Sequence, residues 1–349
     1  MLYYVVVVIF LLFIVARSTG REASQMIFYF AIVLLVTYCA LRNAFLYPDI
    51  SNYYDFFING KSYALGNFGV GYLFLNRFVR FFSSSFQVLL AVVSIIVIGS
   101  YAKVIKEYSP YIWLSLILYI LINYYPSFFI LRQYLAIAMF LLSLQHVVKR
   151  DFIKFSICSI IAISFHTTAL LVVPLYFLYG LNGNKKNMIL LALGSVLIIF
   201  TFKSAAYYVN MFSEYYAGYF ETDVEESMWQ RTLLKIYIAL VYLYTLGKKS
   251  YLAGINRLVF YGMVLNIVIC ISAMNIFSAH RLRDYFAYAD FIGVPIILYE
   301  AAQFKSLKKP IVYLLVAIYI GALAISFNNF VQGSNMSNQY EFFWNSIIR

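Results

Sequence analysis

The chain has 349 residues, of which 64% are hydrophobic and only 11% are charged, and its formal net charge is +12. Together with a mean hydropathy of +0.82, this composition excludes a soluble enzyme, a disordered chain and a disulfide scaffold. The apolar runs are continuous rather than alternating, which disfavours an outer-membrane barrel and predicts an all-α, polytopic transmembrane helical bundle. Loop Lys and Arg residues that orient such helices explain much of the positive charge, so we expect no nucleic-acid partner.

Apolar segments long enough, or nearly long enough, to cross a bilayer recur along the whole chain. They cover residues 2–16, 26–41, 86–101, 111–124, 128–148, 152–165, 167–180, 188–203, 231–247, 257–279, 286–302 and 310–328. The first segment has no basic region and no cleavage site, so we expect a retained span rather than a signal peptide. The polar sequence SFHTT divides 152–180, which either crosses twice or forms two half-helices. We therefore expect a single integral membrane domain, 1–349, with about 11–12 segments.

Lys and Arg residues gather in six connections between these segments, which is the pattern of cytoplasmic loops. These connections hold 15 of the 26 basic residues: Arg17, Arg21, Lys103, Lys106, Lys149, Arg150, Lys154, Lys185, Lys186, Lys248, Lys249, Arg257, Lys305, Lys308 and Lys309. Placing all six inside requires twelve segments and puts both termini outside. The outward side then holds the loop 47–85, the short loop 204–230 and the polar tail 329–349. We expect function to face outward, and the other eleven basic residues to need a separate explanation.

The first outward loop mixes aromatic and polar residues, and an amphipathic helix is expected after Gly69 and Gly71. Tyrosine rings beside Asp and Asn side chains are typical of sugar-binding sites, although aromatic belts at the membrane interface explain most Tyr and Phe residues. The candidate residues of this loop are Asp49, Asn52, Tyr53, Asn76, Arg77 and Arg80.

Arg132 lies four residues into the apolar stretch PSFFILRQYLAIAMFLLSLQ. A charge at that depth is costly, and such residues usually face a cavity or a partner. An arginine that snorkels to the headgroups is the alternative. Gln133 beside it, and the small residues Ala136 and Ala138, favour the interior of a bundle.

His166 lies in the SFHTT sequence that divides 152–180. A histidine that merely caps a break between helices is the alternative to a functional role. The expected topology, however, puts His166 and Arg132 on the same side of the membrane at similar depth. A neutral imidazole there could accept a proton from a hydroxyl or donate a hydrogen bond to a phosphate.

A third cluster lies in FSAHRLRDYFAYADF and comprises His280, Arg281, Arg283, Asp284 and Tyr285. On a helix, Arg281 and Asp284 are three residues apart and could simply pair. Two arginines and a histidine at the outer boundary nevertheless oppose the positive-inside trend, and guanidinium groups suit phosphate oxygens. We expect this cluster to bind an anionic headgroup.

Carboxylates are too few, and too poorly spaced, to predict a metal site. We therefore expect no metal ligands and no cofactor, with arginines stabilising an anionic leaving group in place of a divalent cation.

The order of these motifs resembles that of the EpsG-like branch of the Wzy-type bacterial polysaccharide polymerases, which include O-antigen and capsule polymerases. The matching pieces are YPDISNYYDFF, GVGYLFLNRFV, FILRQYLAIAMFLLS, SFHTTALLVVPL and RLRDYF, and they span most of the chain, from about Tyr47 to Tyr285. The most specific part of the resemblance is the pair of RQ and SFHT motifs, with about thirty residues between them.

The resemblance implies a metal-independent glycosyltransferase of GT-C-like architecture on the outer face of the bacterial inner membrane. Such enzymes move a growing glycan from undecaprenyl diphosphate to a hydroxyl of an incoming lipid-linked repeat unit. By matching position, Arg132 would hold diphosphate, His166 would lie in the same cavity, and Arg281 and Arg283 would bind the second diphosphate or assist the first. Either His166 or Asp49 would supply the base. By analogy with the family, a separate partner protein would regulate chain length.

Three other functions remain open at this point. A ligase that transfers finished glycan to another acceptor would share the donor chemistry. A flippase or transporter of lipid-linked sugars should show matched halves and charges at mid-membrane, whereas the sequence shows no repeat and its candidates crowd one side. A purely structural subunit would not need the arginines and histidine to converge.

Overall fold

The computed structural model describes residues 2–43, 50–59, 69–181, 186–187, 191, 193–195, 197, 226–250, 254–272, 277–333 and 342–343. Nearly all of these residues lie in helices, because a chain so rich in apolar residues must satisfy its backbone polar groups internally. Five described helices are long and apolar enough to cross a membrane, at Arg21–Ala40, Phe86–Tyr108, Leu131–Val148, Gly254–Ser272 and Lys308–Asn329. The predicted all-α, polytopic membrane fold is confirmed.

The chain forms two compact units. Unit 1 comprises Met1–Leu144, Ile153–Leu170 and Leu323–Arg349, and unit 2 comprises Gln145–Phe152 and Leu171–Ala322. Most of the expected segment 188–203 and of the loop 204–230, and much of the tail 329–349, lie outside the described residues.

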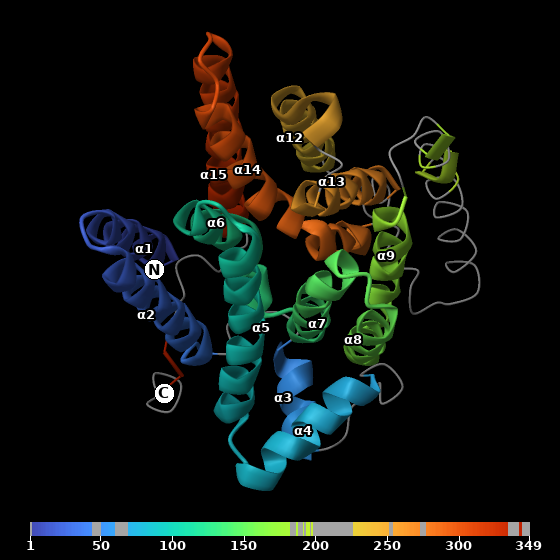
Figure 1. The fold of residues 1–349 in the computed structure, drawn as a ribbon. Coiled ribbons are helices and arrows are strands. Elements are labelled where there is room, and N and C mark those ends of the chain that lie inside the picture. Colours follow the sequence, from blue (N-terminus) through green and yellow to red (C-terminus); the bar gives the residue numbers. More distant parts are fainter. Residues whose placement is uncertain are drawn as a thin grey trace. The chain divides into compact units, whose positions relative to one another are not determined.

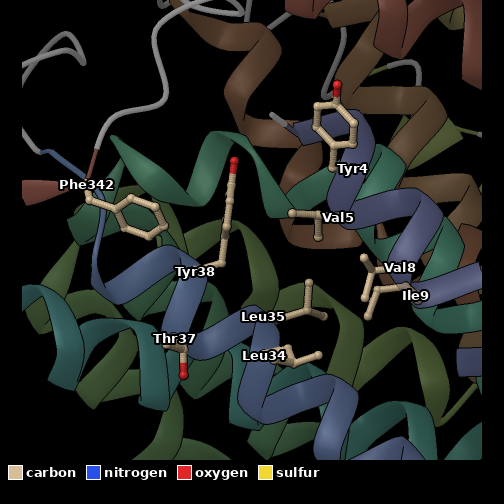
Figure 2. A pocket seen from close by; sticks show the side chains of 9 residues that line it. All are labelled: Tyr4, Val5, Val8, Ile9, Leu34, Leu35, Thr37, Tyr38 and Phe342. Atoms are coloured by element: carbon tan, nitrogen blue, oxygen red, sulfur yellow. The ribbon is translucent and has the colours of Figure 1, made fainter.

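The N-terminal helices of unit 1 pack side by side. Helix α1 (Leu2–Arg17) lies against α2 (Arg21–Ala40), and α2 lies along α5 (Phe86–Tyr108), as Figure 1 shows. An apolar groove of about 330 Å³ opens between α1 and α2 (Figure 2). It is lined by Tyr4, Val5, Val8, Ile9, Leu34, Leu35, Thr37, Tyr38 and Phe342. The groove offers no charged side chain, so it is suited to a hydrocarbon chain rather than to glycosyl chemistry.

Two short helices of unit 1, α3 (Ile50–Asn59) and α4 (Val70–Phe82), lie within residues 47–85. Helix α4 is the amphipathic helix that the sequence predicts. It buries Tyr72, Leu75, Asn76 and Val79 on one face. The opposite face is exposed and rich in phenylalanine, which is typical of a helix that lies in the membrane interface.

A break in unit 1 separates α6 (Ile112–Tyr119) from α7 (Leu131–Val148). The chain passes through a π-helical turn at Ile120–Tyr124 and a 3-10 turn at Pro126–Phe128. Pro126 lacks a backbone N–H and cannot continue a helix, so α7 starts afresh after it. Helical turns of these irregular types often mark functional sites.

The expected division of residues 152–180 is confirmed. Helix α8 (Phe152–Phe165) ends immediately before His166, the 3-10 helix η5 follows at Thr167–Val172, and α9 spans Val173–Tyr179.

Unit 2 is built on three helices that pack against one another: α12 (Glu226–Ser250), α13 (Gly254–Ser272) and α14 (Tyr288–Ala302) (Figure 1). The 3-10 helix η6 (Phe277–Phe286) packs on α13 and leads into α14. Helix α15 (Lys308–Gly333) begins in this unit and ends in unit 1.

Candidate functional site

Arg132 is the second residue of α7, directly after the break. Its side chain is half-buried, and its Nε donates a hydrogen bond to the backbone carbonyl of Phe165 at 3.4 Å. Phe165 is the residue before His166, so the RQ and SFHT motifs, 33 residues apart in the chain, meet within unit 1. The two motifs therefore lie side by side at this contact.

His166 lies in the break between α8 and η5. Its Nδ1 is 2.6 Å from the hydroxyl oxygen of Thr168 and accepts the Thr168 backbone N–H at 3.3 Å. A backbone N–H can only donate, so Nδ1 is the acceptor nitrogen and the neutral ring carries its proton on Nε2. The imidazole therefore caps the break, as the alternative reading expects. The same contact also makes Nε2 a hydrogen-bond donor.

Two glycines bring the start of α4 against the SFHT segment. A Cβ at Gly69 would lie 2.5 Å from the Ser164 backbone oxygen, and a Cβ at Gly71 would lie 2.3 Å from the Ser164 side-chain oxygen. Gly69 also has a φ of +66°, which other residues rarely adopt. The glycines of the GVGY motif therefore permit a close backbone approach that any side chain would block.

Tyr72, one residue after Gly71, connects α4 to the other site residues. It is fully buried, and its ring lies 5.4 Å from that of Tyr53 in an edge-on contact. Asn76 is also buried, and its Nδ2 donates to the Tyr72 backbone carbonyl at 2.7 Å. Burial raises the pKa of the Tyr72 phenol far above its ordinary value, and Tyr53 raises it further, whereas a hydrogen bond with Asn76 and the positive charge of Arg132 lower it.

Unit 1 thus gathers residues from four of the motifs, because Arg132 acts both on Tyr72 and on the backbone beside His166. We call Tyr53, Tyr72, Asn76, Arg132 and His166 the unit 1 cluster. The sequence did not single out Tyr72, because a tyrosine on the buried face of an amphipathic helix is normally explained by packing alone.

Other predicted site residues of unit 1 lie elsewhere. Arg77 and Arg80 are exposed on α4, whereas Tyr72 and Asn76 are buried there. Asn52 is exposed on α3. Gln133 is buried at 2% exposure. Asp49 lies outside the described residues.

The HRLRDYF cluster lies in unit 2, on η6. Arg281 and Arg283 are half-buried, whereas Asp284 and Tyr285 are buried. Asp284 forms an ion pair with its neighbour in the chain, since the Arg283 Nε lies 3.7 Å from the Asp284 Oδ1. The side chain of His280 lies outside the part that the structure describes.

Sequence reasoning missed a buried ion pair in unit 2. Lys235 of α12 and Asp290 of α14 form a salt bridge with both side chains buried. Both lie within apolar segments, and an ionisable residue inside such a segment was the available signal. The Cys270 thiol of α13 lies within electrostatic range of this pair and of Arg283 and Asp284. Arg283 therefore belongs to a cluster whose two positive charges are balanced by two negative ones.

No group of three or more His, Cys, Asp or Glu side chains is placed to hold a metal ion within the described ranges. The positive charge of the unit 1 cluster comes from Arg132.

A family model described as the EpsG family matches residues 25–342. The match covers nearly the whole chain, so the protein belongs to the EpsG family and is a multi-pass, polysaccharide-polymerase-like membrane protein. No curated protein matches the chain, and no solved structure matches it.

Proposed function

We propose that this member of the EpsG family is a membrane glycosyltransferase that polymerises undecaprenyl-diphosphate-linked oligosaccharide repeat units. It would act on the outer face of the bacterial inner membrane and build O-antigen, capsule or exopolysaccharide. One observation carries the proposal: the Arg132 guanidinium, in the first turn of α7, contacts the carbonyl that precedes His166. A cation and a hydrogen-bond donor held together beside a helix break suit a diphosphate.

The reaction joins an acceptor hydroxyl to the anomeric carbon of the donor glycan. The bond between that carbon and the diphosphate oxygen breaks, and its electron pair leaves on the diphosphate. Arg132 stabilises the developing charge on the leaving group, which in a water-poor site is a large contribution to catalysis. The acceptor proton passes to a base.

The hydrogen bonding of His166 favours one of its two expected roles. With Nδ1 accepting from Thr168, the other ring nitrogen carries the proton and donates to a phosphate oxygen. We therefore assign His166 to diphosphate binding, and the role of base to Asp49.

The remaining residues are proposed to contact the two substrates. Tyr53, Asn52 and Asn76 are suited to the sugars, because aromatic rings and amides bind pyranose faces and hydroxyls. Arg281 and Arg283 would bind the second diphosphate. Arg77 and Arg80 would contact lipid headgroups as well as substrate, because α4 exposes them beside its phenylalanine-rich face.

The test uses a strain that lacks the gene and is complemented with the wild type, Arg132→Ala or His166→Ala. Arg21→Ala, an exposed arginine at the start of α2, is the matched control. A polymerase predicts that Arg132→Ala loses the glycan ladder on a gel but keeps one-repeat glycan on the surface acceptor, whereas the control keeps the ladder. Full-length polymer trapped on the carrier lipid would instead indicate a ligase. Repeat units trapped on the cytoplasmic side would indicate a flippase.

A further inference from the structure

Arg42 lies two residues after the end of α2 and is completely buried, at 0% exposure. It is one of the basic residues that the orientation of the helices does not explain. Buried charges are normally paired with an opposite charge. Within the described part of the chain, the hydrogen bonds of this guanidinium instead reach backbone carbonyls and a thiol.

The Arg42 guanidinium is hydrogen-bonded to one peptide group, that of Phe128, in the break before α7. Its Nε and Nη2 both donate to the Phe128 backbone carbonyl, at 3.0 and 2.7 Å. The same group lies 5.3 Å from the centre of the Phe128 ring. Its Nη1 donates to the carbonyl of Cys39, in the last turn of α2. A planar fork with several donors is needed to make all these contacts at once.

The Phe128 carbonyl is one that a continuous helix would satisfy internally. In an unbroken α-helix it would accept the N–H of the residue four positions later, which is Arg132. The helix is interrupted after Pro126. The first backbone hydrogen bond of α7 runs from the Tyr134 N–H to the Ile130 carbonyl at 3.1 Å. Arg42 supplies the donors that the break removes, and so fixes the turn from which Arg132 projects.

The backbone around Arg42 is itself held from two sides. Gln87 of α5 donates to the carbonyls of Ala40 and Arg42. The C-terminal segment adds a second contact, since the Phe343 N–H donates to the Leu41 carbonyl at 3.0 Å. The guanidinium is therefore a rigid link between the end of α2 and the break.

We infer that Arg42 is a positioning residue that holds the break before α7 so that Arg132 meets the diphosphate. The inference rests on the proposed function, because it assumes that Arg132 binds diphosphate. Arg42 itself does not touch substrate. Its effect on ligand binding must therefore pass through Arg132.

A double-mutant cycle tests this dependence with purified full-length protein in lipid nanodiscs and undecaprenyl diphosphate as the ligand. Arg42→Gln removes the charge and the fork. We expect it to weaken binding about 10-fold when Arg132 is present, and by no more than about twofold in the Arg132→Ala background, since coupled residues are not additive. Arg42→Lys keeps the charge but loses the fork, and is expected to fall between Arg42→Gln and the wild type. This variant also tests the inference if Arg42→Gln does not fold.

Arg150 offers a matched control in unit 2. Its guanidinium likewise donates to a backbone carbonyl, that of Tyr176, and lies 4.1 Å from the Tyr176 ring. Arg150→Lys should leave the dissociation constant within about twofold of the wild type, because the same chemistry there does not serve Arg132.

The outcomes separate the inference from the proposed function. Equal weakening by Arg42→Gln in both backgrounds would mean that Arg42 only supports packing, and would overturn the inference. No weakening by Arg42→Gln or Arg42→Lys would overturn it as well. If Arg132→Ala itself binds undecaprenyl diphosphate as tightly as the wild type, the diphosphate role of Arg132 fails, and with it the proposed function.

Discussion

Replacing either glycine of the GVGY motif with alanine should push the start of α4 away from the SFHT segment. A Cβ at Gly71 would meet the Ser164 Oγ at 2.3 Å and the Ser164 carbonyl carbon at 3.0 Å. A Cβ at Gly69 would meet the Ser164 backbone oxygen at 2.5 Å. Since Tyr72 follows Gly71 directly, the displacement would also move the tyrosine away from Arg132.

The two substitutions should differ in size. Overpacking of this kind costs about 1–3 kcal/mol, and at Gly71 a gain of about 0.5–1 kcal/mol in helix propensity offsets part of it. Gly69 gains no such offset, because its φ of +66° adds about 1–3 kcal/mol of backbone strain for alanine. We therefore expect a destabilisation of about 0–2.5 kcal/mol for Gly71→Ala and about 2–6 kcal/mol for Gly69→Ala.

The assay measures the Tm of the detergent-solubilised protein and the rate of polymer formation per folded protein. Gly99→Ala is the control, since Gly99 also lies in unit 1 and a Cβ there would meet nothing within 4 Å. The control should match or exceed the wild-type Tm and keep its rate. Wild-type Tm and rate in Gly69→Ala would refute the argument that bare backbone is required at this contact.

Adding Ser164→Ala gives a second check on the same contact. It removes the side-chain oxygen that Gly71→Ala would meet, but leaves the backbone oxygen that Gly69→Ala would meet. The second substitution should therefore restore much of the loss in Gly71→Ala and little of the loss in Gly69→Ala. Equal rescue of both would contradict the geometry.

Three further predictions concern charge and pH. Lys235→Met leaves Asp290 buried without its cation and should lower the free energy of unfolding by about 3–5 kcal/mol. The double variant Lys235→Met, Asp290→Leu should recover most of this loss. A Lys235→Met variant as stable as the wild type in thermal unfolding would argue against the ion pair. Because arginines rather than a metal are proposed to stabilise the leaving group, EDTA should change the polymerisation rate by less than about twofold, and complete loss with recovery on adding Mg²⁺ would count against this mechanism. Burial keeps the Tyr72 phenol protonated above pH 10.0, where an unfolded phenol ionises, so native stability falls as pH rises past that value. Tyr72→Phe should make the fall shallower by the equivalent of one proton, about 1.4 kcal/mol per pH unit, in alkaline denaturation.

Much of the fold follows from local sequence patterns. The apolar run at 86–101 predicts the body of α5, and the polar SFHTT sequence predicts the break that the structure has at His166. The amphipathic period after Gly69 predicts α4. These features are local, because helix formation and helix breaks depend on residues within a few turns of one another.

The contacts that build the site depend on how helices are rotated and set against each other, which periodicity does not encode. The approach of Gly69 and Gly71 to Ser164 joins segments more than ninety residues apart. The ion pair of Lys235 with Asp290 spans 55 residues. Composition alone also places an arginine such as Arg42 at the surface, whereas its carbonyl acceptors let it be buried.

The most direct test of the central claim is polymerisation by purified protein in lipid nanodiscs supplied with a synthetic undecaprenyl-diphosphate-linked repeat unit. The account predicts that the wild type makes polymer and releases one undecaprenyl diphosphate for each bond formed. It also predicts that Arg132→Ala lowers both by at least about 100-fold, the loss typical of removing one group that stabilises a leaving anion. Polymer from Arg132→Ala at the wild-type rate, or none from a folded wild type, would contradict it.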